Sequence, residues 1–188
     1  MPSALPASPL ASLLNALATQ RRVFVSRHDH DAAWHEQLSR VYHQAWELVR
    51  DRSLDGLYGT PESDDEYIMR QIRENHIAGT SCTLVLCGPQ TWQRKYVDWE
   101  IYATLNKEHG LLGINLPTNP LQADGRYWVP PRLFDNWQSR YAVWAQWKDL
   151  ATDPALLPKL IEQAIARDKG LIDNSRRTMG RNLSRWGT

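Results

Sequence analysis

Cysteine is almost absent from this sequence, which contains only Cys82 and Cys87. The two lie within one expected strand at odd spacing, so their side chains point to opposite faces and cannot pair with each other. The chain also has no apolar run long enough to cross a bilayer, and no positively charged start before its first apolar stretch, as a signal peptide would have. These absences predict a reduced, cytoplasmic protein without a membrane partner.

Neither sign of charge is in excess, since 22 basic residues stand against 21 acidic ones. A near-neutral chain gives no reason to expect nucleic acid or an anionic membrane as a partner. Only the end of the chain, from Arg167 onward, is clearly basic.

Phenylalanine is also scarce, with two residues, whereas there are nine tryptophans. Because tryptophan favours rims, clefts and interfaces, this excess indicates binding surfaces.

Several familiar site motifs are missing. The segment Gly88-Pro89-Gln90 is neither a dinucleotide-binding glycine motif nor a P-loop, and the sequence has no GxSxG elbow and no paired zinc spacing. His28 and His30, flanked by Asp29 and Asp31, resemble part of a metal site, but the sequence offers no third ligand. We therefore expect no metal and no bound cofactor.

The apolar pattern alternates between strands and helices. Apolar runs predict strands over Arg22–Ser26, Leu54–Tyr58, Thr83–Cys87, Leu111–Leu116 and, at an edge, Tyr141–Trp147. Helical spacing predicts helices over Ser8–Thr19, Trp34–Val49, Glu62–Gly79, Thr91–Gly110 and Pro154–Ala166, with a long polar loop over Pro117–Pro131. This order predicts an α/β fold of three layers (αβα), flavodoxin-like, with a mostly parallel five-stranded sheet.

Glu100 is the candidate that this arrangement singles out. Ligands bind where parallel strands end, and the turn at Gly88 leaves such an end. With Thr91 as helix N-cap, Glu100 lies beside Val97 and Thr104, on the border of the apolar stripe. Position alone leaves two interpretations of Glu100 open, a rim residue that forms a salt bridge or a site residue. It favours the rim residue. Ser26, Arg27 and His28 follow the first strand and leave from the same sheet edge.

Three stretches together resemble a known family. They are RRVFVSRHDHD at residues 21–31, IAGTSCTLVLCGPQTWQRKYVDWEI at 77–101 and GLLGINLP at 110–117. They are similar to bacterial TIR-like domains, above all the stand-alone type that forms the ThsB component of Thoeris anti-phage systems. The likeness extends over about residues 20 to 166 and is sharpest in the VDWEI segment.

The resemblance implies an enzyme that cleaves the nicotinamide–ribose bond of NAD, with Glu100 as the catalytic residue. It places the NAD pocket at Ser26, Arg27 and His28, and the loop near Leu57–Pro61 as the one that gates the site and mediates self-association. We expect Arg27 to contact phosphate because its planar fork suits that group. Gly88 is assigned to the pocket as well, and Trp92 or Trp99 could stack on a ring of NAD, although a core or interface role suits each equally.

The resemblance also implies a role in anti-phage defence. The product would be an ADP-ribose-derived signal, cyclic by expectation, that activates a separate effector protein. Two segments depart from the minimal family pattern: the tryptophan-rich stretch Tyr127–Trp147 and the basic end Asp168–Thr188. The expected division is an N-terminal arm with a short helix over 1–19, a TIR-like domain over 20–167 and a basic C-terminal extension over 168–188.

Three alternatives stay open on the sequence. The first is a non-catalytic TIR-like adaptor that acts by self-association, which the tryptophan excess suits. The second is a nucleoside deoxyribosyltransferase-like enzyme, which uses a similar sheet and a glutamate nucleophile. The third is a receiver-like domain, which the lack of an aspartate at Cys87-Gly88 disfavours.

Overall fold

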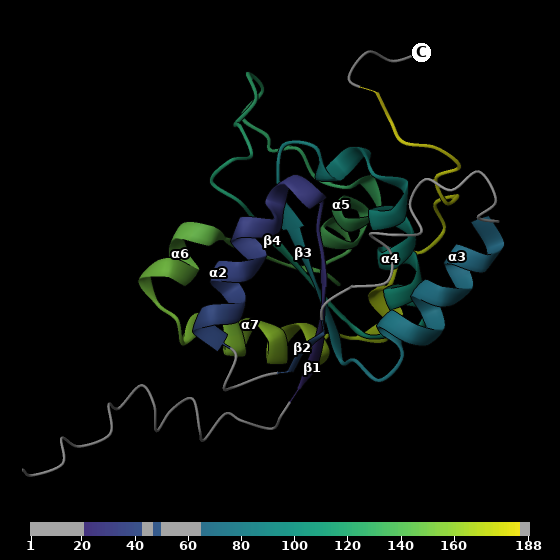
Figure 1. Cartoon of the computed structure of the whole chain (residues 1–188), viewed down its shortest axis with the longest axis horizontal. Helices are drawn as coiled ribbons and strands as arrows, with labels where there is room; N and C mark the ends of the chain where they lie inside the picture. The colour runs from purple at the N-terminus through teal and green to yellow at the C-terminus, as the bar shows by residue number, and fades with distance from the viewer. Residues whose placement is uncertain (1–20, 43–46, 50–64, 185–188) are drawn as a thin grey trace, which may run out of the picture.

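Five parallel strands form the centre of the protein (Figure 1). The computed structural model describes residues 21–42, 47–49 and 65–184. Strands β1 (Arg22–Ser26), β3 (Cys82–Cys87) and β4 (Gly110–Asn115) lie inside the sheet, between the edge strands β2 (Glu47–Val49) and β5 (Val143–Gln146). The order β2-β1-β3-β4-β5 is that of flavodoxin-like sheets. The predicted fold class is therefore confirmed.

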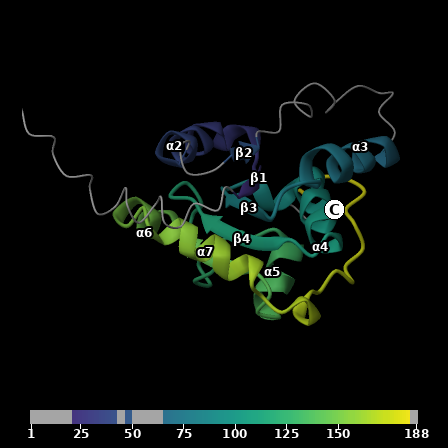
Figure 2. The same cartoon turned by 90° about the horizontal axis from the view of Figure 1, so that it is seen from below.

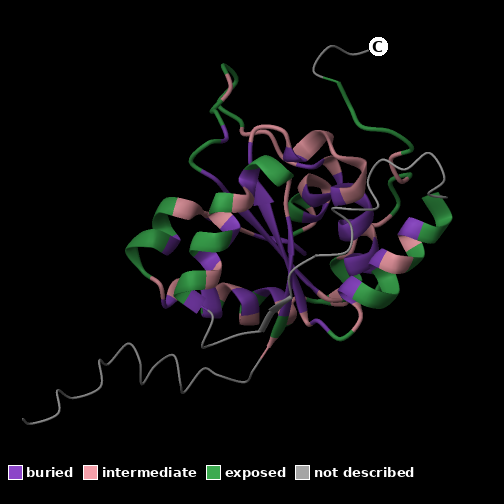
Figure 3. Ribbon diagram, viewed as in Figure 1, coloured by how far each residue is buried: buried purple, intermediate pink, exposed green. Residues whose placement is uncertain are grey.

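Helices cover both faces of the sheet (Figure 2). One face packs against α2 (Ala32–Tyr42), α6 (Trp147–Thr152) and α7 (Leu156–Ile165). The other packs against α3 (Asp65–Gln71) with its π-helical continuation Ile72–Ile77, and against α4 (Lys95–Asn106) and α5 (Pro131–Gln138). Figure 3 shows the central strands buried and the helices exposed on their outer sides. Among the described residues, none of the helices has the length and apolarity that crossing a membrane requires.

The side chains of β1 alternate between these two layers. Val23 and Val25 contact the α2 and α7 side, whereas Phe24 packs among residues of α3 and α4. Because strand side chains alternate, Ser26 shares a face with Phe24 and points toward α4. Cys82 and Cys87 are both buried and free, and they lie in different core clusters on opposite faces, as predicted. Burial raises the pKa of both thiols.

Two predicted elements need correction. The helix predicted over Trp34–Val49 ends at Tyr42, and Glu47–Val49 forms β2 instead. Leu48 and Val49 satisfy the helical spacing, but parallel pairing with β1 decides their conformation. Thr91 does not cap α4: it begins a short 3-10 turn, and α4 starts at Lys95 without a side-chain cap. The predicted segments Ser8–Thr19 and Leu54–Tyr58 lie outside the described residues.

Two further helices, α5 and α6, were not predicted. Pro130 and Pro131 favour a loop interpretation, yet proline suits the first position of a helix, where α5 places Pro131. The strand predicted over Tyr141–Trp147 is shorter in the structure, where α6 takes over at Trp147.

Gly113 of β4 provides a test of the packing between β5 and the sheet. A Cβ at this position would lie 2.6 Å from the Trp144 ring and 3.0 Å from a Leu133 methyl. We expect Gly113→Ala to lower the free energy of unfolding by about 1–3 kcal/mol, because overpacking forces buried side chains off their rotamers. Urea denaturation measures this change.

Gly180→Ala is the matched control, because no atom lies within 4 Å of the Cβ that it would add. Its effect should stay within about 0.5 kcal/mol. Equal effects of the two substitutions would contradict this account of Trp144 packing.

Candidate functional site

Glu100 is buried at the carboxyl end of β1, with 4 % of its surface exposed. The Ser26 hydroxyl donates a hydrogen bond of 2.5 Å to Glu100 Oε2. This length is typical of a hydroxyl that donates to a carboxylate. Glu100 is therefore not the rim residue that position alone favoured, and its side chain is directed toward the sheet edge where ligands bind in folds of this type.

A chain of hydroxyl groups fixes the helix that carries Glu100. The Thr104 hydroxyl donates to the Glu100 backbone carbonyl at 2.7 Å and lies 2.7 Å from the hydroxyl of Thr83 on β3. Since Thr104 has one proton to donate, Thr83 is the donor of the second bond. Both threonines are fully buried. They fasten the middle of α4 to the sheet beside the acid.

A small cavity of about 160 Å³ opens beside Glu100. Residues after β1, residues at the start of α4 and one residue near the end of the chain line it: Arg27, His28, Asp29, Arg94, Tyr96, Val97, Glu100 and Asn182. Two guanidinium groups thus share the cavity with the Glu100 carboxylate. Such an arrangement can receive a ligand that carries both anionic groups and a developing positive charge.

Arg27 is held in place by its own loop. Its Nη1 atom lies 3.3 Å from the His28 carbonyl oxygen and 3.6 Å from Asp29 Oδ1. The side chain is 16 % exposed. Arg94 donates to Gln90 Oε1 at 2.7 Å. Both cations are thus positioned by residues of their own loops.

His28 is neutral in this setting. Burial, and to a smaller extent the nearby Arg94, lower the pKa of its imidazole from 6.5 to about 4. Its Nδ1 atom accepts a hydrogen bond of 3.1 Å from the His30 amide, which fixes the ring at the start of the loop. A neutral ring adds no charge to the two arginines.

Gly88 and Trp92 lie away from the cavity. Gly88 allows the buried Asp31 carboxylate to approach the turn after β3, and its amide donates to the Thr91 hydroxyl at 3.0 Å. Burial raises the pKa of the Asp31 carboxyl, and the Thr91 hydroxyl partly opposes this shift. The Trp92 ring stacks on Trp128 at 4.4 Å between centroids. The structure therefore gives both residues a packing role, and contact with NAD stays a prediction.

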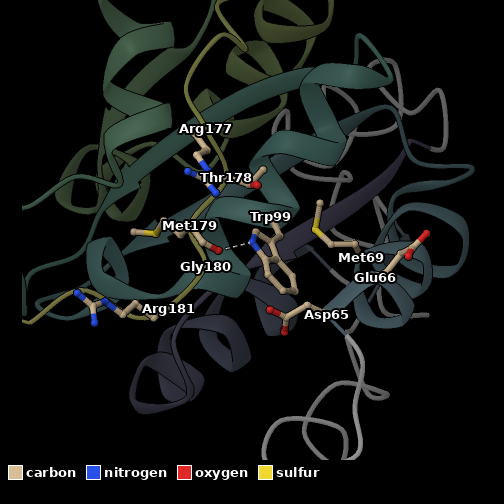
Figure 4. A pocket seen from close by; sticks show the side chains of 9 residues that line it. All are labelled: Asp65, Glu66, Met69, Trp99, Arg177, Thr178, Met179, Gly180 and Arg181. Carbon is tan, nitrogen blue, oxygen red and sulfur yellow. Dashed lines mark hydrogen bonds between the residues drawn. The ribbon is translucent and has the colours of Figure 1, made fainter.

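Trp99 belongs to the core between α3 and α4, where 3 % of it is exposed. Its indole N–H donates to the Met179 carbonyl at 2.8 Å (Figure 4). It borders a larger open groove of about 760 Å³ between α3 and residues 177–181. The core role that the sequence left open for Trp99 is thus the one that the structure shows.

The described residues contain no group of three or more His, Cys, Asp and Glu side chains that could hold a metal ion. His28 and His30 instead lie edge to face, with 4.6 Å between their ring centroids. Asp29 forms its ion pair with Arg27, and Asp31 turns inward to Thr91.

A comparison with known protein families confirms the resemblance seen in the sequence. The family model for the TIR-like domain of the Thoeris protein ThsB matches residues 24–120. The chain belongs to the ThsB TIR-like family. No curated protein matches it. The matched range includes Ser26, Glu100 and the other cavity residues except Asn182.

Sequence reasoning did not assign five residues of this ThsB-family cavity to the site: Asp29, Arg94, Tyr96, Val97 and Asn182. Helical spacing placed Val97 beside Glu100, but only as part of the apolar stripe, and Arg94 precedes α4, which starts at Lys95. The pattern R-x-Y-V before Asp98 and Glu100 was a usable signal, since it places a cation within two helical turns of Glu100. Asn182 comes from a distant part of the chain, and no local pattern links it to the site.

The depressed pKa of His28 makes a prediction about stability. Between pH 6.5 and about 4 the unfolded chain binds a proton at His28 that the folded chain does not, so this group lowers stability as the pH falls. His28→Asn keeps a side-chain acceptor for the His30 amide but does not titrate. We expect the free energy of unfolding to fall less in this variant between pH 7 and pH 5. An equal fall in both proteins would show that His28 is not held neutral.

Proposed function

We propose that this ThsB-family chain cleaves the bond between nicotinamide and ribose in NAD, with Glu100 as the catalytic residue. The observation that carries the proposal is the buried Glu100 carboxylate, held by Ser26 beside a cavity that contains Arg27 and Arg94. The TIR-like ThsB family of the domain supports the defence context, and NAD is proposed as the substrate from the resemblance to TIR-like domains.

The chemistry requires only one carboxylate. Nicotinamide leaves with the electron pair of the broken C–N bond, which neutralises its own positive charge, so no acid has to protonate it. The ribose is left as an oxocarbenium-like cation, which a fixed carboxylate stabilises electrostatically or traps covalently. The Ser26 hydroxyl keeps the Glu100 carboxylate in one orientation before the substrate binds.

The arginines provide the binding part of the site. The diphosphate of NAD carries negative charge, and a guanidinium fork matches phosphate oxygens. Arg27 and Arg94 line the same cavity as Glu100. We assign Arg27 to phosphate, as the sequence suggests, and add Arg94 as its partner.

The acceptor determines the product. Water adds to the anomeric carbon and yields ADP-ribose, with its proton passing to Glu100, whereas an adenine nitrogen of the same molecule yields a cyclic isomer. We propose a cyclic ADP-ribose-derived signal that activates a separate effector protein in anti-phage defence. Self-association of the domain is part of this proposal.

The other readings are less well supported. The adaptor reading rested on exposed tryptophans, yet of the tryptophans in the described part of the chain only Trp137 is exposed. A deoxyribosyltransferase-like enzyme would use the same buried glutamate. The two enzymes differ in substrate: exchange of bases on deoxyribonucleosides with NAD untouched would establish the transferase.

Glu100→Gln tests the catalytic assignment. The amide keeps the size of the side chain and an acceptor for the Ser26 hydroxyl, but it removes the charge. We expect nicotinamide release from NAD, measured by chromatography, to fall by about 100-fold or more, as when one electrostatic group is lost. Circular dichroism and the unfolding midpoint should show that the fold is retained.

Glu36→Gln is the matched control. Glu36 lies on α2, on the opposite side of the sheet, in an exposed ion pair of 3.7 Å with Arg40. Its substitution should leave NAD turnover unchanged. Full activity in the Glu100 variant would refute the assignment.

A further inference from the structure

The final described segment, residues 173–184, crosses the outer side of α4 (Figure 1). We call it the C-terminal strap. It lies outside the range that matches the ThsB family. The strap runs from the end of α4 back to its start, and its contacts change in strength along this path.

Hydrogen bonds and an ion pair hold the beginning of the strap against α5. The Asn136 side chain accepts a hydrogen bond of 3.0 Å from the Asp173 backbone amide and donates one of 2.7 Å to the Asp173 backbone carbonyl. Arg176 forms a two-pronged ion pair with Asp135, at 2.6 and 2.9 Å, which raises the pKa of the guanidinium. Fork-to-fork pairs of this kind are among the stronger polar contacts.

The middle of the strap completes a buried ion pair. Arg132 of α5 contacts both carboxylate oxygens of Asp98 on α4, at 2.9 and 3.3 Å. Asn174 accepts from Arg132 at 2.7 Å, and the Met179 amide donates to Asp98 at 2.9 Å. If this part of the strap detached, Arg132 and Asp98 would each lose one hydrogen bond, and their ion pair would become exposed to water.

The tip of the strap forms hydrogen bonds with two backbone groups at the start of α4. The Lys95 amide donates to Asn182 Oδ1 at 2.9 Å, and the Leu183 amide donates to the Gln93 carbonyl at 2.8 Å. Asn182 and Leu183 are both exposed. Asn182 also lines the cavity that contains Glu100.

Gly180 separates the firm part of the strap from its tip. Glycine rotates more freely than any other residue, and nothing within 4 Å would hinder a Cβ here. The part before Gly180 contacts charged side chains, whereas the tip forms neutral hydrogen bonds, so the tip detaches more easily. The tip can lift while the contacts of Asp98 and Arg132 stay in place.

The cavity beside Glu100 is small for the proposed substrate. Its volume is about 160 Å³, whereas sites for drug-sized ligands occupy roughly 300–1,000 Å³. A dinucleotide thus needs more room than the cavity offers while Asn182 lies at its edge.

We propose that the tip of the strap, residues 181–184, is an autoinhibitory closure of the Glu100 site that competes with NAD. The proposal rests on the proposed function, because NAD is taken as the occupant. With the tip docked, the protein is closed; when the tip lifts at Gly180, the cavity opens and NAD binds. Part of the binding free energy is spent on displacing the contacts of the tip, these two hydrogen bonds among them, which weakens the apparent affinity.

The test compares NAD binding in chains that carry Glu100→Gln, so that the ligand is not consumed. One chain is full length, a second ends after Gly180, and a third carries Asn182→Ala. We expect calorimetry to show roughly tenfold tighter binding to the shortened chain, since the contacts of the tip, including these two hydrogen bonds, no longer oppose the ligand. Asn182→Ala should give part of this gain.

Arg177→Ala in the same strap is the matched control and should bind NAD as the full-length chain does, because Arg177 borders the groove beside Trp99 and not the Glu100 cavity. Equal or weaker binding by the shortened chain would overturn the closure while leaving NAD as the ligand. Failure of every chain to bind NAD would instead overturn the proposed function, and the closure with it.

Discussion

The ion pair between Asp98 and Arg132 is the interaction on which the candidate site depends. Their side chains are 3 % and 0 % exposed, and removing one partner of such a pair costs about 3–5 kcal/mol because the other charge stays buried. Each partner also bonds to the strap, so α4, α5 and the end of the chain are joined at one point. Asp98 and Glu100 are two positions apart in α4, so their side chains point in directions that differ by about 200°. The ion pair therefore holds α4 on one side while Glu100 points to the sheet on the other.

Glu100 meets the sheet through polar contacts on a largely apolar face. Ser26 and Thr83 are the hydroxyl residues that β1 and β3 present to α4, and both form hydrogen bonds that orient the helix or its acid. A buried carboxylate costs free energy unless it is hydrogen-bonded. The Ser26 bond offsets part of this cost and fixes the geometry in advance, which is how preorganised sites stabilise charge.

The sequence predicted the elements whose signal is local. Unbroken apolar runs mark β1, β3 and β4 because both of their faces are covered. The signal failed at Leu48 and Val49, because an adjacent apolar pair fits both a helical stripe and an unbroken apolar strand, and long-range pairing with β1 decides between them. It also left Glu100 undecided, because Ser26 is 74 residues away. The strap has no apolar pattern at all, since polar and backbone contacts hold it, and so Asn182 could not be linked to the cavity.

The central claim is that Glu100 faces the ribose of NAD whose bond to nicotinamide breaks. A crystal structure of the Glu100→Gln chain with NAD measures this directly. The account predicts the anomeric carbon of that ribose about 3–3.5 Å from the side chain at position 100, the separation of reacting groups, with the diphosphate at Arg27 and Arg94. NAD bound elsewhere, or with this ribose turned away from position 100, would contradict it.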